Sequence, residues 1–237
     1  MKILDISGPT PHTKPLVVIA VLTRNRPERL AKCLDGIRRG MRTSLCDSLL
    51  WVWNNGDAPV AGQTHHLGHN VGQHISINRM IQEAVTNRAD WFVRVDDDCE
   101  FQTRDWLARM IHIQKRHMEI YKRPCVLAPF VHGLRNPPAQ MADVRIGKYL
   151  LHVVPMLGGI CRMMPMNHLR YWRFDERMPM GWSEASAYAR YCIQTTMPML
   201  RCVNIEVSHG GSTDEQDAVE PDLAYEREML KHVAYGL

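Results

Sequence analysis

Residues 91–98, WFVRVDDD, place an apolar run directly before three consecutive aspartates. A short apolar run of this kind is typical of a β-strand that is buried on both faces. Three adjacent carboxylates repel one another unless a cation or strong hydrogen-bond donors compensate their charge. The stretch therefore predicts a buried strand that ends at a cation site formed by Asp96, Asp97 and Asp98.

The chain before this stretch alternates between strand-like and helix-like patterns. Apolar runs at 16–22 and 49–53 predict two further strands, each followed by polar turn residues. Apolar residues recur at helical spacing at 27–40, where Pro27 suits the first turn, and again at 77–85. This alternation predicts an α/β fold in which helices flank a mainly parallel central sheet.

The second half of the chain is less regular. We expect Thr103 to cap a helix whose apolar face includes Trp106 and Ile111. A loop is predicted at 133–147, and the last residues are helix-like at 221–233. Further strands are predicted at 126–131, 150–154 and 202–207.

Length and composition restrict the class of protein. A chain of 237 residues can bury one sizeable core, so one domain over 1–237 is expected. The 45% hydrophobic and 23% charged residues exclude a disordered, collagen-like or coiled-coil chain. Apolar runs are shorter than the ~18 residues of a membrane span, and the first residues lack a signal-peptide pattern. We expect a cytoplasmic protein with no membrane segment and, since its seven cysteines are scattered, reduced thiols.

The strand order predicts where a ligand binds. In parallel sheets ligands lie beyond the carboxyl ends of the strands, so the polar clusters at 23–26, 54–57 and 96–100 should gather along one edge. A solvated acidic turn is the alternative interpretation of the aspartates, and their position after a strand favours the ligand site. If the strand continues, side-chain alternation pairs Asp96 with Asp98. Carboxylate pairs suit a hard divalent ion, Mg²⁺ or Mn²⁺.

Several motifs in a fixed order resemble the family 2 glycosyltransferases of the GT-A fold. In the first half they are TRNRP at 23–27, NNGD at 54–57, NVG at 70–72 with Asn78, and VDDD at 95–98. In the second half they are LGGI at 157–160, RFDER at 173–177, GWSE at 181–184 and SHGG at 208–211. The resemblance covers residues 16–212.

The resemblance implies a metal-dependent transferase that moves a sugar from a nucleotide-sugar donor. It implies a nucleotide-sugar-binding half at 16–125, an acceptor half at 126–212 and a C-terminal tail at 213–237. Mn²⁺ or Mg²⁺ would bind Asp98, His209 and Asp96, and a UDP-sugar is favoured over a GDP-sugar. The implied donor-binding residues are Thr23, Asn25, Arg26, Asn54, Asn55, Asn78, Asp96 and Asp97.

The resemblance also implies a general base, which would take the proton of the acceptor hydroxyl in a single inverting displacement. The matching residue is Glu184. Here the chain departs from the family, since Ser183-Glu184 stands where the family has Glu-Asp. A saccharide or a small molecule is favoured as the acceptor, ahead of modified DNA.

Other interpretations stay open at this point. A nucleotidyltransferase would need a glycine-rich GxGxR loop, and the segment after the first strand contains no glycine. The changed Ser183-Glu184 pair leaves room for an inactive nucleotide-sugar-binding module. Asn54 and Asn55 could read the base or form an ordinary Asn-Gly turn. A zinc site at the histidines is disfavoured, because their spacing matches no familiar site; they are His65, His66, His69 and His74.

Overall fold

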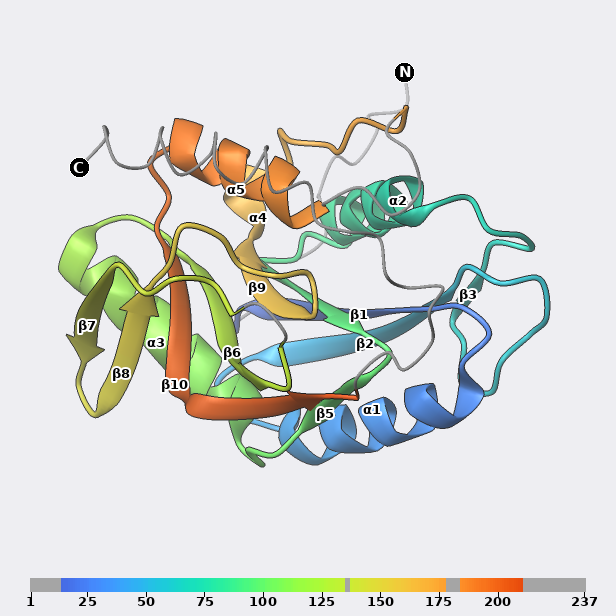
Figure 1. Ribbon diagram of the computed structural model, residues 1–237, viewed down its shortest axis with the longest axis horizontal. Coiled ribbons are helices and arrows are strands. Elements are labelled where there is room, and N and C mark those ends of the chain that lie inside the picture. Colours follow the sequence, from blue (N-terminus) through green and yellow to red (C-terminus); the bar gives the residue numbers. More distant parts are fainter. Residues whose placement is uncertain (1–13, 135–136, 178–183, 211–237) are drawn as a thin grey trace, which may run out of the picture.

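The computed structural model describes residues 14–134, 137–177 and 184–210 (Figure 1). The elements of the first half are β1 (Leu16–Thr23), α1 (Pro27–Gly40), β2 (Asp47–Asn54), β3 (His65–His66), α2 (Gln73–Thr86), β4 (Trp91–Asp96), β5 (Cys99–Phe101) and α3 (Trp106–Tyr121). Those of the second half are β6 (Val126–His132), β7 (Ala142–Ile146), β8 (Tyr149–Val153), β9 (Cys161–Pro165), α4 (Met166–Leu169), α5 (Glu184–Gln194) and β10 (Met199–His209).

One ten-stranded sheet runs through the described residues in the order β3-β2-β1-β4-β9-β6-β10-β8-β7, and β5 pairs with β10. The strands β3, β2, β1 and β4 are parallel neighbours. Beyond β4 the sheet is mixed: β9 is antiparallel to both β4 and β6, whereas β10 is parallel to β6. The parallel half therefore brings the polar ends of β1, β2 and β4 to one edge, as the sequence predicts.

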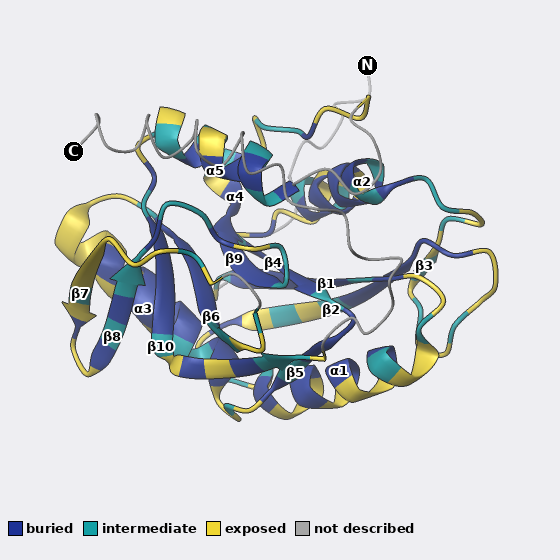
Figure 2. Cartoon of the chain, viewed as in Figure 1, coloured by how far each residue is buried: buried dark blue, intermediate teal, exposed yellow. Residues whose placement is uncertain are grey.

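Helices cover both faces of this sheet. The two faces of β1 show the division, because Ile19 and Val21 belong to the core shared with α1 and α3, whereas Val18 and Ala20 belong to the core shared with α2, α4 and α5. Figure 1 shows α1 on one side of the sheet and α2, α4 and α5 on the other. In Figure 2 the central strands are buried and the outer face of α1 is exposed. The predicted α/β fold is confirmed.

The predicted strands and helices of the first half occur at their expected places, but the start of α3 was predicted wrongly. The helix begins at Trp106 after Asp105, and no side-chain capping bond closes its start. Thr103 instead pairs with β10: its Oγ1 accepts a hydrogen bond of 2.9 Å from the backbone N–H of Glu206. The hydroxyl of Thr103, which the local sequence pattern assigned to a helix cap, therefore bonds to the distant strand β10.

The second half differs more from the prediction. The segment predicted as a loop at 133–147 contains β7, which pairs antiparallel with β8 and so depends on a partner strand for its hydrogen bonds. The strand β9 was not predicted, although all its residues are buried. The C-terminal tail at 213–237, with its helix-like pattern at 221–233, lies outside the described residues.

The membrane prediction can be tested only on the described ranges. Every helix within them is too short or too polar to cross a lipid bilayer.

Candidate functional site

Two of the three aspartates lie in a tight turn at the carboxyl end of β4. The strand ends at Asp96, and Asp97 and Asp98 form the turn that leads into β5. Arg26 reaches both turn residues, with its Nη1 3.4 Å from Asp97 Oδ1 and 3.4 Å from Asp98 Oδ2. Thr23 donates from Oγ1 to Asp97 Oδ2 at 2.7 Å. Because the strand ends at Asp96, the pairing of Asp96 with Asp98 by side-chain alternation does not apply. Asp97 and Asp98 instead share Arg26 as a partner.

Asp97 is held in the protein interior by these contacts. Only 4% of the residue is exposed. Burial raises the pKa of its carboxyl, while the hydrogen bond from Thr23 and the charge of Arg26 act in the opposite direction. Asp97 therefore links the polar end of β1 to the end of β4.

Asp96 faces a different partner. Its Oδ1 accepts from Arg94 Nη2 at 2.7 Å, two residues earlier on β4. Although 29% of the side chain is still accessible, the surrounding protein desolvates the carboxyl and raises its pKa to about 6, against the charge of Arg94. The neighbouring carboxylates of Asp97 and Asp98 raise it further.

His209 reaches the aspartate turn because of strand pairing. The end of β10 runs antiparallel to β5, which places His209 opposite Cys99, and the N–H of Gly210 donates to the carbonyl of Asp98 at 2.9 Å. The side chains meet with His209 Nε2 3.4 Å from Asp98 Oδ2. A segment more than a hundred residues away in the sequence thus completes this edge.

Asp98 and His209 stabilise each other's charged forms. The hydrogen bond with Asp98 raises the pKa of His209, against desolvation. Burial opposes the ionisation of Asp98, but the hydrogen bond and charge of His209 and the charge of Arg26 together lower its pKa below 3.8. The charged pair lies where the sequence predicts a metal.

The fit of a divalent ion rests on Asp98. Within the described residues its Oδ1 is buried and has no hydrogen-bond partner, so it is an acceptor atom that still lacks a donor or a cation. In the same part of the chain no three His, Cys, Asp or Glu side chains are already gathered around one point. A divalent ion would be held by Asp98 and by the neutral form of His209, so its binding would displace the proton of His209 and leave further coordination positions to diphosphate oxygens and water.

Glu184 begins α5 and lies among buried basic side chains. Only 4% of the residue is exposed. Its Oε2 is 3.0 Å from Arg94 Nη1 and accepts from Gln73 Nε2 at 3.1 Å, and its Oε1 is bound by Arg162 Nη2. Both arginines are fully buried and face each other across the pair of strands β4 and β9. Glu184 therefore compensates two buried positive charges.

Gly159 makes room for this cluster. Its carbonyl accepts a hydrogen bond from Arg94 Nη1. A Cβ at this position would collide with that same nitrogen and would lie 2.9 Å from Glu184 Oε2, whereas a Cβ on Gly158 would meet nothing within 4 Å. Only the second glycine of the pair is thus required by close packing.

The loops after β1 and β2 touch each other. Asn25 adopts φ +56°, a left-handed conformation that asparagine tolerates. A Cβ on Gly56 would lie 2.5 Å from Asn25 Oδ1, so the two loops approach at a residue without a side chain. This contact brings the first two predicted donor motifs together.

Asn54 and Asn55 are buried; Asn54 is bonded within its own loop, whereas Asn55 is bonded to the segment before α2. Asn54 Nδ2 donates to the carbonyl of Ala58 at 2.7 Å and to Gln63 Oε1 at 2.9 Å. Asn55 Nδ2 donates to Asn70 Oδ1 at 2.9 Å. These bonds agree with the turn interpretation, and base recognition by either residue stays a prediction.

Asn78 binds a turn of the second half. Its Oδ1 accepts from the N–H of Phe174 at 2.9 Å, and its Nδ2 donates at 2.9 Å both to the carbonyl of Phe174 and to Glu176 Oε1. Asn78 thus anchors the RFDE turn on α2. It is not brought into contact with the aspartates by any of these bonds, and its place in donor binding stays a prediction.

Three of the four histidines considered for zinc, His65, His66 and His74, are engaged separately. The ring of His65 stacks on Trp53 at a centroid distance of 4.1 Å, and His66 Nε2 lies 3.0 Å from the carbonyl of Gly56. The ring of His74 stacks on Phe174. These contacts do not converge on one point.

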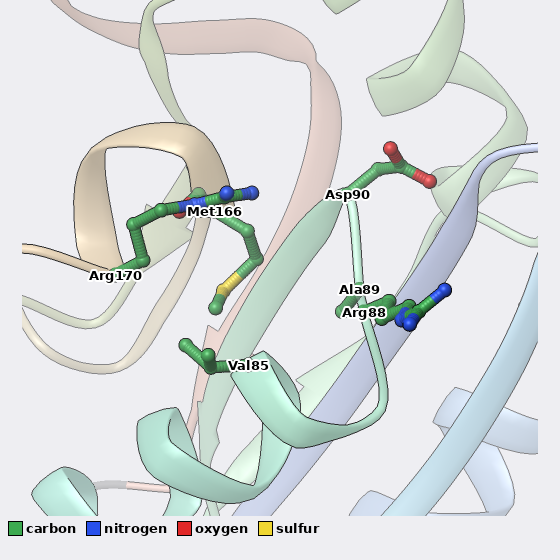
Figure 3. Close-up of a pocket in the computed structure, with 6 residues that line it drawn as sticks. All are labelled: Val85, Arg88, Ala89, Asp90, Met166 and Arg170. Carbon is green, nitrogen blue, oxygen red and sulfur yellow. The ribbon is translucent and has the colours of Figure 1, made fainter. Parts of the chain in front are cut away.

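A pocket of about 340 Å³ lies at the other end of β4 (Figure 3). Asp90 at its rim precedes β4 and accepts from the N–H of Leu16 at 2.8 Å, at the amino end of β1. The pocket is therefore separate from the aspartate turn. Its lining residues are Val85, Arg88, Ala89, Asp90, Met166 and Arg170.

Sequence reasoning missed Arg94 and Arg162. The signal for Arg94 was available, because an arginine in the middle of the apolar run WFVRVDDD must be paired if the strand is buried on both faces. Asp96 lies two residues away, but the other partners, Gly159 and Glu184, could not be named because they are distant in sequence. Arg162 carried no comparable signal because β9 was not predicted.

Comparison with known proteins identifies the fold. No family model matches the chain, and no curated protein matches it in sequence. The structure of GalNAc-T7 with UDP, GalNAc and Mn²⁺ matches with a TM-score of 0.67 at 10% identity, over 91% of this chain and 48% of that one. TarS of S. aureus matches with a TM-score of 0.60 at 12% identity, over 94% of this chain and 40% of that one. The mannosyltransferase PcManGT of Pyrobaculum calidifontis, in complex with GDP-Man and Mn²⁺, matches with a TM-score of 0.58 at 15% identity, over 90% of this chain and 62% of that one.

These neighbours share the GT-A fold of glycosyltransferases, and the predicted fold is thereby confirmed. The chain spans about half the length of the structures it matches. Membership of family 2 stays a prediction.

Proposed function

We propose that this protein is a metal-dependent glycosyltransferase that uses a nucleotide-sugar donor. The observation that carries the proposal is the buried Asp98 Oδ1, which lacks a hydrogen-bond donor within the described residues and lies at the carboxyl edge of the parallel strands. Neighbours of the same fold hold UDP with Mn²⁺ or GDP-Man with Mn²⁺, which supports a nucleotide and a divalent ion at this edge.

The donor diphosphate would lie against the aspartate turn. Asp98 and His209 are the proposed metal ligands, with Asp96 beside them, and Arg26 adds positive charge 3.4 Å from Asp97 and Asp98. When bound, Mn²⁺ or Mg²⁺ would act as a Lewis acid that stabilises the charge of the departing nucleoside diphosphate. The remaining proposed donor contacts are Thr23, Asn25, Asn54, Asn55 and Asn78. A UDP-sugar is favoured and a GDP-sugar is the second choice.

Glu184 is the proposed general base. A carboxylate offers about four acceptor sites; Oε2 uses its two on Arg94 and Gln73, and Oε1 uses one on Arg162. One acceptor site on Oε1 is left for the proton of the acceptor hydroxyl. As that proton leaves, the acceptor oxygen would bond to the anomeric carbon while the bond to the diphosphate oxygen breaks, which inverts the anomeric configuration.

The first experiment measures nucleoside diphosphate release from a panel of UDP-, GDP- and dTDP-sugars with Mn²⁺ or Mg²⁺. We expect metal-dependent turnover of one donor, and a loss of turnover of about 100-fold or more in Asp98→Ala and in Glu184→Gln. Water serves as the acceptor in this assay, so the acceptor need not be known.

The panel also separates the alternatives. Donor binding without turnover would support an inactive nucleotide-sugar-binding module, and release of pyrophosphate from nucleoside triphosphates would support a nucleotidyltransferase. If no donor binds with either metal, the proposal is wrong. A saccharide or a small molecule is the favoured acceptor, ahead of modified DNA, and screening follows once the donor is known.

A further inference from the structure

The fully buried Arg94 contacts both halves of the proposed site. On one side its Nη2 lies 2.7 Å from Asp96 Oδ1, and on the other its Nη1 lies 3.0 Å from Glu184 Oε2. The same Nη1 also binds the carbonyl of Gly159. The two carboxylates are 88 residues apart in sequence (184 minus 96), yet one planar guanidinium group joins them.

The surroundings make this link rigid. Arg94 lies in the middle of β4, between the parallel strand β1 and the antiparallel strand β9. Its side chain is 0% exposed, and the ion pair with Glu184, whose side chain is 3% exposed, is shielded from water. A guanidinium group has fixed geometry and always carries its charge, and a shift of one bound carboxylate therefore affects the other.

Arg162 provides an internal comparison. It is equally buried and also binds Glu184, through Oε1, and its guanidinium lies 4.7 Å from the ring of Tyr188. Burial lowers the pKa of Arg162 and the charge of Asp96 acts to raise it, but no hydrogen bond or ion pair described for Arg162 reaches an aspartate of the turn. Charge compensation of Glu184 is therefore shared by both arginines, whereas the link to Asp96 belongs to Arg94.

We propose that Arg94 is a positioning residue that couples the donor-side carboxylate Asp96 to the acceptor-side carboxylate Glu184. This inference rests on the proposed function, because it assigns Asp96 to the donor and Glu184 to the acceptor. Arg94 contacts neither substrate. It fixes the separation of the two carboxylates, so that an acceptor held at Glu184 faces the anomeric carbon of a donor held at the aspartate turn.

The test compares Arg94→Met with Arg162→Met. The probes are Mn²⁺ with UDP or with GDP, whichever binds the wild type, and the matching donor sugar for turnover. We expect both variants to lower turnover, and only Arg94→Met to weaken nucleotide binding as well, by about tenfold or more, as when one partner of a buried charge pair is removed. Equal nucleotide affinities in the two variants would overturn the inference.

Two additional measurements separate positioning from general stability. In Arg94→Lys the charge remains, but a single ammonium cannot hold two carboxylates in a fixed fork, so we expect the melting temperature to recover and turnover to stay low. Parallel recovery of both would indicate a structural role only.

In a Glu184→Gln background, Arg94→Met should change turnover at saturating donor by less than about twofold, since the partner is already lost. A fully additive loss would contradict the coupling.

If the arginine variants do not fold, the glycine pair replaces them. Gly159→Ala would push on Arg94 and Glu184 without removing a charge, whereas Gly158→Ala adds its methyl group in open space. We expect the first to lower turnover by about tenfold and the second to leave it unchanged; equal effects would overturn the inference. If the wild type neither binds nor turns over a donor, the proposed function itself is wrong. If the wild type is active but Gly159→Ala and Gly158→Ala have equal effects, only the coupling through Arg94 is wrong.

Discussion

The aspartate turn and the Glu184 cluster are both buried and acidic, but they differ in how their charge is compensated. Asp98 is 7% exposed and Glu184 is 4% exposed. Asp98 has contacts at Oδ2 only, from Arg26 and His209 at 3.4 Å, and its Oδ1 has no donor in the described part of the chain. Glu184 has donors on both oxygens.

The difference separates a carboxylate with one oxygen that still lacks a donor from a carboxylate with donors on both oxygens. A buried carboxylate whose charge is incompletely compensated is stabilised when a cation binds. A buried carboxylate that is already paired mainly compensates the charge of the arginines around it. Variants at the two places should therefore have opposite profiles, with large effects on stability at Glu184 and large effects on binding at Asp98.

The largest loss of stability is expected for Glu184→Ala. Removal of this carboxylate leaves Arg94 and Arg162 buried without their shared partner, a defect that costs about 3–5 kcal/mol in proteins. Urea unfolding followed by circular dichroism measures the change in the free energy of unfolding. Glu184→Gln is the matched control for size; a loss below about 1 kcal/mol in Glu184→Ala would show that the cluster contributes little to stability.

A smaller loss is expected for Asn78→Ala, which tests how firmly the turn at 173–177 is attached to α2. The variant leaves the buried N–H and carbonyl of Phe174 without partners, which costs about 1–3 kcal/mol for each unpaired group. Thermal unfolding provides the measurement. Asn87→Ala serves as the control, because Asn87 donates to the carbonyl of Glu83 at the surface; similar losses in the two variants would contradict the anchoring role.

For Asp98→Ala we expect a change in stability within about 1 kcal/mol. The variant loses the contacts with Arg26 and His209 but also relieves repulsion, because Asp98 raises the pKa values of Asp96 and Asp97. Binding should respond instead: Mn²⁺ with UDP or GDP should raise the melting temperature of the wild type and not that of the variant. An equal rise in both proteins would exclude Asp98 as a metal ligand.

The smallest effect is expected at His117, a buried histidine outside both regions. Burial lowers its pKa below 6.5, and the charge of Arg123 acts in the same direction, against a hydrogen bond to the carbonyl of Arg123. Between the two pKa values, His117 is protonated in the unfolded chain and neutral in the folded chain. The wild type should therefore lose stability as the pH falls below 6.5, until the lower pKa of the folded chain is reached. His117→Asn should flatten this part of the pH profile of unfolding. An unchanged slope would exclude His117 as its source.

The grouping of polar residues at the carboxyl ends of the parallel strands was largely predictable from sequence. Buried strands in a parallel sheet have mainly apolar runs, and the polar residues that follow them must meet at one edge. The runs at 16–22, 49–53 and 91–95 thereby predict that Thr23, Arg26 and the aspartates lie near one another. A short-range pattern suffices here because each side chain follows directly from the end of its own strand.

The tertiary structure decided which groups complete the site. His209 meets Asp98 because β10 pairs with β5, and Glu184 at the start of α5 can bind Arg94 and Arg162 together because the pairing of β9 with β4 places the two arginines opposite each other. Periodicity reports whether a residue faces the core or the solvent, but it does not report which distant segment lies opposite. Ion pairs between sequence-distant residues depend on the strand order, and that order follows from the packing of the whole chain.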